Sequence, residues 1–195
     1  MAYEIEIKAR VNENELDDVK AALMAIPGAK ALGESDKFDI YWSQTEDGEP
    51  LFRTRREQLK GADRVLFTAK PFKNKYTNGT EENQELEFTA PAGQWDDILT
   101  FFSGVGLQVC RLKWKKGPGY VLEVDGYVIH AELLNVRFLG WFLEMEICPG
   151  TKEGFDFNKA DAALRKVLKQ VRIPEDRIEA VGYNKLLKAV GKDRG

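Results

Sequence analysis

Glutamates separated by a single residue recur on three predicted strands of this chain. These pairs are Glu4 with Glu6, Glu85 with Glu87, and Glu144 with Glu146. Alternate residues of a β-strand point to the same face, so each pair would set two carboxylates side by side. Carboxylate oxygens are ligands that Mg²⁺ and Mn²⁺ prefer. The spacing therefore predicts strand faces that can hold a divalent cation.

Basic side chains show a similar arrangement in other segments. They are Lys8, Arg53, Arg55, Lys70, Arg111, Lys113 and Lys115. Lysine binds phosphate oxygens as a point charge, and arginine often binds them through two parallel hydrogen bonds. Acidic and basic rows in one protein suit a polyanion that arrives with divalent cations. We therefore expect a site for a phosphorylated compound together with Mg²⁺ or Mn²⁺.

The residues between these charges are apolar. Leu86 and Phe88 alternate with one glutamate pair, and Leu143 and Met145 alternate with another. Amphipathic helices must bury an apolar stripe, and the apolar strand faces are their natural partner. The charged faces would then line a hydrated interior, because burying lone charges costs several kcal/mol each. The alternative is that these charged faces form an ordinary solvated sheet surface.

Strand-type alternation and helical periodicity follow each other in an order typical of an antiparallel α+β fold. Strands are expected at 3–11, 37–43, 51–58, 64–70 and 84–89, and between 107 and 147. Helices are expected at 12–26, 91–104 and 158–171. Asn12 and Glu15 have the spacing of a helix capping box. The polar segment 71–82 is expected to be a mobile loop, and Gly117–Pro118–Gly119 a turn.

These elements predict a closed antiparallel β-barrel of about eight strands, with amphipathic helices packed outside. The chain has 195 residues, a length that suits one domain and is short for two. We therefore expect a single domain over residues 1–195.

Composition excludes several classes of protein. With 29 Lys and Arg against 32 Asp and Glu, the net charge is -3, so a generic DNA-binding function is not expected. The single histidine, His130, excludes a multi-histidine metal site, and Cys110 and Cys148 are expected to be reduced thiols. No apolar run is long enough to span a membrane, and the N-terminus has no signal-peptide core. We expect a cytoplasmic protein.

Several segments, taken together and in order, resemble the CYTH family, also called the triphosphate tunnel metalloenzymes. Glu4–Ile5–Glu6–Ile7–Lys8 is similar to its E-x-E-x-K signature. Other segments resemble its further motifs: 37–42 (KFDIYW), 51–55 (LFRTR), 67–71 (FTAKP), 85–87 (ELE), 109–113 (VCRLK), 139–146 (LGWFLEME) and 182–187 (GYNKLL). Two departures stand out. Leu134 occupies the position of a family aspartate, for which Glu132 is a candidate replacement, and the basic types are swapped at Arg111 and Lys113.

The resemblance implies residue roles inside a charge-lined barrel. The implied catalytic residues are Glu4, Glu6, Lys8, Glu144 and Glu146. The implied ligands of Mg²⁺ or Mn²⁺ are Glu4, Glu6, Glu85, Glu87, Glu144 and Glu146. The implied phosphate-binding residues are Lys8, Arg53, Arg55, Lys70, Arg111, Lys113 and Lys115.

The resemblance also implies an enzyme that acts on a small-molecule triphosphate. The first expectation is conversion of ATP to cyclic AMP and pyrophosphate, as in class IV adenylyl cyclases. Hydrolysis of tripolyphosphate or thiamine triphosphate by a triphosphatase is the alternative. A non-catalytic polyphosphate- or nucleotide-binding module is a second alternative, and a protein-interaction domain is a third. Since dimers are common among these cyclases, a homodimer stays open.

Overall fold

The computed structural model describes residues 2–59 and 61–194 and forms a closed antiparallel β-barrel. Around the barrel the strands follow the order β1–β5–β4–β3–β2–β6–β7–β8, and β8 closes the ring onto β1. The strands are β1 (Ala2–Val11), β2 (Lys30–Ser43), β3 (Phe52–Leu59), β4 (Ala62–Lys75), β5 (Glu81–Pro91), β6 (Gln108–Val124), β7 (Tyr127–Val136) and β8 (Gly140–Ile147). The expected barrel is confirmed. Of the predicted domain 1–195, residues 1, 60 and 195 lie outside the described residues.

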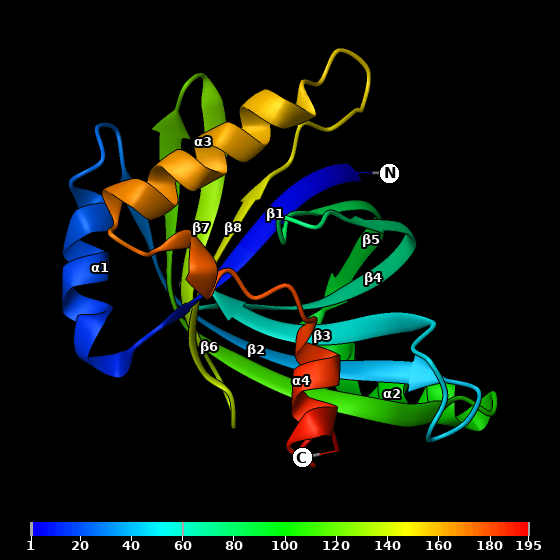
Figure 1. The fold of residues 1–195 in the computed structure, drawn as a ribbon. Coiled ribbons are helices and arrows are strands. Elements are labelled where there is room, and N and C mark those ends of the chain that lie inside the picture. The colour runs from blue at the N-terminus through cyan, green and yellow to red at the C-terminus, as the bar shows by residue number, and fades with distance from the viewer. Residues whose placement is uncertain (1, 60, 195) are drawn as a thin grey trace.

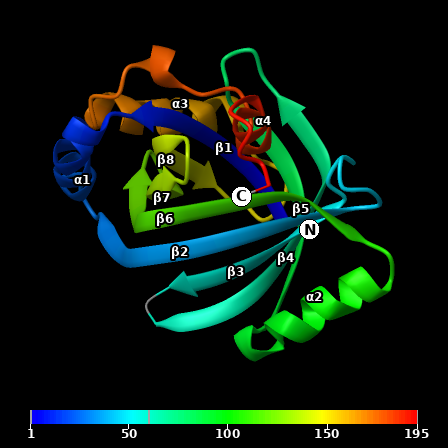
Figure 2. The same cartoon turned by 90° about the horizontal axis from the view of Figure 1, so that it is seen from below.

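Helices pack on the outside of this barrel, as expected (Figures 1 and 2). They are η1 (Glu13–Glu15), α1 (Leu16–Met24), η2 (Ala92–Gln94), α2 (Trp95–Gly104), α3 (Phe157–Gln170), η3 (Glu175–Arg177) and α4 (Tyr183–Ala189). Figure 1 shows α3 lying across β7 and β8, and α3 also contacts β1. Figure 2 shows α2 on the opposite side of the barrel. In the described part of the chain, no helix combines the length and apolar character needed to cross a bilayer.

The hydrophobic core lies between the barrel wall and the helices. The outward-facing Ile7, Leu133 and Met145 are almost completely buried, and they belong to one cluster with Leu164 and Val167 of α3. Because apolar and charged residues alternate along these strands, burying this face turns the charged side chains toward the barrel interior.

The structure confirms the predicted capping box at the start of the first helical segment. The backbone N–H of Asn12 donates to a carboxylate oxygen of Glu15 at 3.1 Å, and Asn12 and Glu15 form the capping box. The first turn is a 3₁₀ turn, and the helix then ends at Met24, two residues before the expected end. The α3 helix begins and ends within one residue of its expected range 158–171.

The prediction of a mobile loop at 71–82 was wrong. β4 and β5 extend into this segment as a hairpin, and only 76–80 lie between the strands. The Thr80 hydroxyl donates to Asp161 of α3 at 2.5 Å, and Arg165 donates to the Thr80 hydroxyl at 3.2 Å. Composition alone indicated a loop, because these stabilising contacts come from a helix far along the chain.

The predicted turn at Gly117–Pro118–Gly119 was also wrong, because these residues lie within β6. They pair with the first half of β2, which begins at Lys30 rather than at Lys37. A Cβ atom at Gly117 would lie 2.0 Å from the carbonyl oxygen of Leu133. Glycine is needed at this position for the close approach of the neighbouring strand, a second use of glycine besides turns.

Candidate functional site

The barrel interior is lined by charged side chains that are largely buried. Those less than one-tenth exposed are Glu4, Lys8, Lys37, Asp39, Arg55, Glu57, Glu85, Arg111, Lys113 and Lys115. Strand register places them at neighbouring positions; Lys8 pairs with Glu144, for example, and Asp39 with Lys113. The prediction that the ionic faces turn inward is therefore confirmed, and an ordinary solvated sheet surface is excluded.

Charges of one sign predominate on each side of the barrel, although Lys8 lies on the acidic side and Asp39 and Glu57 on the basic side. We call the inward basic residues of the adjacent strands β3, β2 and β6 the basic wall: Arg53, Arg55, Lys37, Arg111, Lys113 and Lys115. We call six inward acidic residues of the adjacent strands β5, β1 and β8 the acidic wall: Glu81, Glu85, Glu4, Glu6, Glu144 and Glu146. One strand separates the walls on each side, β4 with Lys70 and β7 with Glu132, so the two walls face each other.

Asp39 organises the basic wall. It is fully buried and accepts two hydrogen bonds from Arg55, at 2.6 and 3.1 Å. The ammonium group of Lys113 lies 3.0 Å from Asp39, and Arg53 lies 3.7 Å away. Burial would raise the pKa of Asp39, but the three cations outweigh it and hold that pKa well below its usual value. One carboxylate thus fixes three phosphate-binding candidates in place.

Lys115 joins the two walls. Its ammonium group donates to a carboxylate oxygen of Glu144 at 2.7 Å. Burial opposes ionisation of Glu144, but the charge and hydrogen bond of Lys115 outweigh it and lower the pKa of this carboxyl. The ring of Tyr183, at the start of α4, lies beside the pair, with its centroid 5.7 Å from the Lys115 nitrogen. Glu144 is therefore held as a carboxylate.

The acidic replacement suggested for Leu134 lies on the inner face of β7. Glu132 pairs in register with Glu144 and accepts hydrogen bonds from Lys37 at 2.5 and 2.6 Å. Lys37 also pairs with Glu57 at 3.3 Å. Leu134 is fully buried and pairs in register with Phe142. Glu132 therefore adds a carboxylate to the lining, whereas Leu134 adds only apolar surface.

Lys70 lies among three carboxylates of the acidic wall. Its nitrogen is 2.5 Å from Glu4, 2.6 Å from Glu85 and 4.0 Å from Glu6. Burial opposes protonation of Lys70, but the three glutamates outweigh it and raise its pKa. Burial, only partly offset by Lys70, raises the pKa of Glu6 to about 6. Negative charge thus exceeds positive charge at this place.

Glu146 adds to the excess of negative charge on the acidic wall. A carboxylate oxygen of Glu146, a carboxylate oxygen of Glu4 and the sulfur of Cys148 all lie within 4.8 Å of one another. Within residues 2–59 and 61–194, no basic side chain pairs with Glu146. Burial, followed by repulsion from Glu4 and Glu6, raises the pKa of Glu146 to about 8. Protons or cations are therefore needed to balance this part of the wall.

The donor set fits a hard divalent cation. The side-chain oxygen of Asn83 is buried and has no hydrogen-bond partner in the part of the chain that the structure describes, and the Asn83 amide nitrogen donates to Glu4 at 2.9 Å. One oxygen of Glu144 is also buried and unpaired. Carboxylate and amide oxygens are the ligands that Mg²⁺ and Mn²⁺ take. Glu4, Glu146 and Asn83 are accordingly the residues that could hold such an ion.

The remaining predicted residues are dispersed along the lining. Lys8 lies 3.2 Å from Glu81, and Glu87 accepts a hydrogen bond from Thr68 at 2.7 Å, away from Glu4 and Glu146. Arg111 pairs at 3.2 Å with Asp193, which belongs to the C-terminal segment after α4. The predicted metal ligands are therefore not gathered at one point, and several are paired with bases.

Sequence reasoning missed the roles of Glu81, Asn83 and Asp193. Glu81 and Asn83 share the alternation of Glu85 and Glu87, so extending the strand pattern backwards would have found them. The polar, glycine-containing composition of 71–82 hides this continuation of the strand, and Asn83 carries no charge. No local signal marks Asp193, which reaches Arg111 only through the path of the C-terminal segment.

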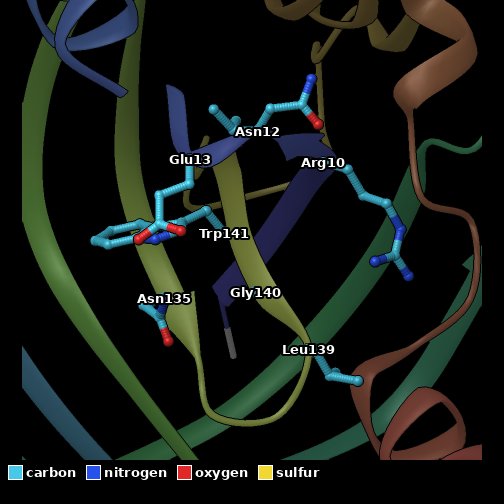
Figure 3. Close-up of a pocket in the computed structure, with 8 residues that line it drawn as sticks. Arg10, Asn12, Glu13, Asn135, Leu139, Gly140 and Trp141 are labelled. Carbon is cyan, nitrogen blue, oxygen red and sulfur yellow. The ribbon is translucent and has the colours of Figure 1, made fainter. Parts of the chain in front are cut away.

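A separate pocket of about 340 Å³ lies at the ends of β1 and β8, near η1 (Figure 3). Figure 3 shows Arg10 and Leu139 pointing to one side, and Glu13 and Trp141 to the other. Arg10 is already paired with Glu179 at 2.7 Å. None of the predicted metal or phosphate ligands lines this pocket, so the candidate site remains the barrel interior.

The fold and lining define a class: closed antiparallel barrels whose interior is charged. Solved structures with this fold include PH1819 of Pyrococcus horikoshii OT3, which is 21% identical with a TM-score of 0.76 over 96% of this chain and 99% of that one. A Vibrio parahaemolyticus protein provisionally assigned as an adenylate cyclase is 15% identical, with a TM-score of 0.67 over 95% of this chain and 98% of its own.

HpAC1 of Hippeastrum, a candidate adenylyl cyclase described as having a dominant triphosphatase activity, also has this fold. It is 14% identical with a TM-score of 0.65, over 98% of this chain and 97% of that one. No protein-family model matches the chain, and no curated protein matches it in sequence. The three structures therefore establish a shared fold.

Proposed function

We propose that this chain is a divalent-metal-dependent enzyme of the CYTH type that processes a triphosphate inside the barrel. The observation that carries the proposal is the opposition of the basic and acidic walls within one closed barrel. A basic wall alone would bind phosphates, but a purely anion-binding module gains nothing from six facing carboxylates. The facing carboxylates are instead suited to cations that accompany the phosphates. The described activities of the Vibrio and Hippeastrum proteins agree with this reaction class.

The residue roles that we propose are those that the resemblance to the CYTH family implies, and the two walls support them. The proposed catalytic residues are Glu4, Glu6, Lys8, Glu144 and Glu146. The residues proposed to hold Mg²⁺ or Mn²⁺ are Glu4, Glu6, Glu144 and Glu146, with Glu85, Glu87 and Asn83 in support. The proposed phosphate ligands are Lys8, Arg53, Arg55, Lys70, Arg111, Lys113 and Lys115. When bound, the metal supplies neutralisation of charge on the phosphoryl oxygens.

Catalysis would depend on positions fixed before the substrate arrives. Asp39 already holds Arg55 and Lys113 in place, so these cations need little rearrangement when charge develops on the phosphoryl oxygens. Phosphoryl transfer requires mainly in-line positioning and charge stabilisation, which such a lining provides. The walls would thus orient the triphosphate as well as bind it.

Two reactions are compatible with this lining. In the first, the ribose 3′-hydroxyl of ATP attacks the α-phosphorus, and cyclic AMP and pyrophosphate form. In the second, water attacks the terminal phosphorus of tripolyphosphate or thiamine triphosphate. One observation favours the second reaction: the lining aromatic residues Tyr41 and Tyr183 contact lysines, which leaves them less available to stack on a base.

The decisive experiment offers ATP, tripolyphosphate and thiamine triphosphate separately to the purified protein, with Mg²⁺, with Mn²⁺ and with chelator. We expect metal-dependent turnover of at least one compound, and cyclic AMP or orthophosphate identifies the reaction. Glu6→Gln should abolish turnover while the fold is kept, whereas Glu123→Gln, at an exposed position of β6, should not. Binding without turnover would favour the non-catalytic module, and neither binding nor turnover would refute the proposal.

A further inference from the structure

Tyr183, like Asp193, is a side chain through which the C-terminal part of the chain reaches the charged interior. It begins α4, is 8% exposed and packs edge-on against Phe142, with ring centroids 5.0 Å apart. Val136 completes this small apolar cluster, and Leu186 of α4 packs against it. The cluster covers the lining beside Lys8 and Glu144, so the ring of Tyr183 lies between an apolar cover and the charges.

Three lysine nitrogens surround this ring. Lys113, Lys8 and Lys115 lie 5.4, 5.5 and 5.7 Å from its centroid. These distances are within the range of cation–π attraction. All three lysines are among the proposed phosphate ligands, so the face of Tyr183 touches the place where phosphate oxygens would gather.

Within residues 2–59 and 61–194, no group lies within hydrogen-bond distance and angle of the buried Tyr183 hydroxyl. One oxygen of Glu144 is also buried and unpaired, while the other is bonded to Lys115. Each nearby lysine already has a carboxylate partner: Glu81 for Lys8, Asp39 for Lys113 and Glu144 for Lys115. Burial and the neighbouring Glu144 carboxylate raise the pKa of Tyr183 well above its usual value, so its hydroxyl is a protonated, buried donor next to Glu144 and beside a predicted anion site.

We propose that the Tyr183 hydroxyl donates a hydrogen bond to a phosphate oxygen of the bound triphosphate, which makes α4 part of the substrate site. This inference rests on the proposed function. A purely packing role explains the ring but not the hydroxyl, because phenylalanine would fill the same space against Phe142 without burying an unpaired polar atom. An incoming phosphate oxygen supplies the missing acceptor.

The test compares variants that separate the hydroxyl from the packing. Tyr183→Phe removes only the hydroxyl, and Leu186→Ala loosens the same apolar cluster. Tyr120→Phe is a matched control, since Tyr120 is buried in the outer core. Binding of tripolyphosphate with Mg²⁺ is measured by calorimetry, thermal unfolding is measured without ligand, and kcat and KM are measured on the compound that the wild-type protein turns over.

Tyr183→Phe should bind tripolyphosphate about 10- to 100-fold more weakly, as expected for a lost hydrogen bond to a charged group. Its ligand-free unfolding temperature should be unchanged or higher, because an unpaired buried donor is removed. Leu186→Ala should lower the unfolding temperature and bind more tightly than Tyr183→Phe, and Tyr120→Phe should bind like the wild type.

Two failures are distinguishable. Wild-type affinity in Tyr183→Phe, with normal binding by the wild-type protein, would overturn this inference alone. A wild-type protein that binds no triphosphate would overturn the proposed function, and this inference with it. A Tyr183→Phe variant that loses affinity only in proportion to a lower unfolding temperature would indicate a packing role and would also overturn the inference.

Discussion

Asp39 is the most deeply buried charge of the lining, and its surroundings explain why it tolerates burial. Three cations lie within 3.7 Å, two of them within 3.0 Å. An isolated carboxylate in such a place would take up a proton, but Asp39 remains ionised. The same contacts hold the cations, so Asp39 has a positioning role in the basic wall rather than a direct role in binding phosphate.

Asp39→Asn should destabilise the protein by about 3–5 kcal/mol, because it leaves Arg55 and Lys113 buried without their counter-charge. Since the folded pKa is lowered, the stabilisation from Asp39 is fully present above about pH 4, the unfolded value, and is lost as the pH falls toward the folded pKa. Denaturant unfolding at several pH values measures this effect. Asp63→Asn, at an exposed ion pair with Arg56, should cost less than about 1 kcal/mol.

The contribution of Glu146 to folding stability should depend on pH in the opposite direction to that of Asp39. Its folded pKa of about 8 lies above the unfolded value, so its contribution to stability is fully present below about pH 4 and is lost as the pH rises to about 8. In chelator, the unfolding temperature should therefore fall over this range more steeply for the wild-type protein than for Glu146→Gln.

Added Mg²⁺ should remove much of that difference, because a cation bound at Glu4 and Glu146 favours the ionised carboxylates. Scanning calorimetry with and without Mg²⁺ measures both effects. Equal slopes for the wild-type protein and Glu146→Gln in chelator would show that Glu146 is not under electrostatic strain in the folded state.

The sequence indicates which faces of the strands are charged, but not which carboxylate meets which base. Alternation placed Glu4 and Lys113 on inward faces correctly, because the side-chain period of a strand is two. The pairing of Glu144 with Lys115 depends on the curvature of the barrel across its interior. No pattern within either strand contains that information.

At the scale of elements, local patterns predicted most strands, and long-range contacts decided the rest. The hairpin at 71–82 is stabilised by Thr80 and Asp161, which are 81 residues apart. The segment after α4 is a second example. The backbone of Asp193 accepts a hydrogen bond from Leu112 at 2.7 Å, and its carboxylate reaches Arg111. Such contacts are invisible to reasoning about one segment at a time.

The C-terminal segment places a carboxylate where a phosphate oxygen would be expected. Asp193→Asn should free Arg111 from a largely buried ion pair and strengthen the binding of tripolyphosphate, by about fivefold for each 1 kcal/mol that the pair contributes. Calorimetric titration measures the change. Asp47→Asn, which removes the exposed partner of Arg194, is the matched control. Weaker binding by Asp193→Asn would instead show that Asp193 orders Arg111 for the substrate.

At the scale of the whole molecule, strand order produces the separation of charge. β1 and β5 are neighbours in the barrel although three strands lie between them in sequence, and β2 and β6 are likewise neighbours. The acidic residues of β1, β5 and β8 come from distant parts of the chain. Closure of the sheet could be expected from the sequence, but this non-sequential order could not, and it determines which charges face each other.

The two facing walls have a stereochemical consequence. A phosphorus atom within a chain between them would present one non-bridging oxygen to guanidinium and ammonium groups and the other to the carboxylate side. The phosphorus is a prochiral centre and its two non-bridging oxygens are diastereotopic, so the barrel should distinguish the diastereomers of an α-thio analogue of ATP. A difference of about 1.4 kcal/mol between their barriers gives rates that differ about tenfold. Separate turnover measurements on the two diastereomers test this, and equal rates would contradict it. The barrel would then select one configuration at phosphorus because its opposite sides carry opposite charge.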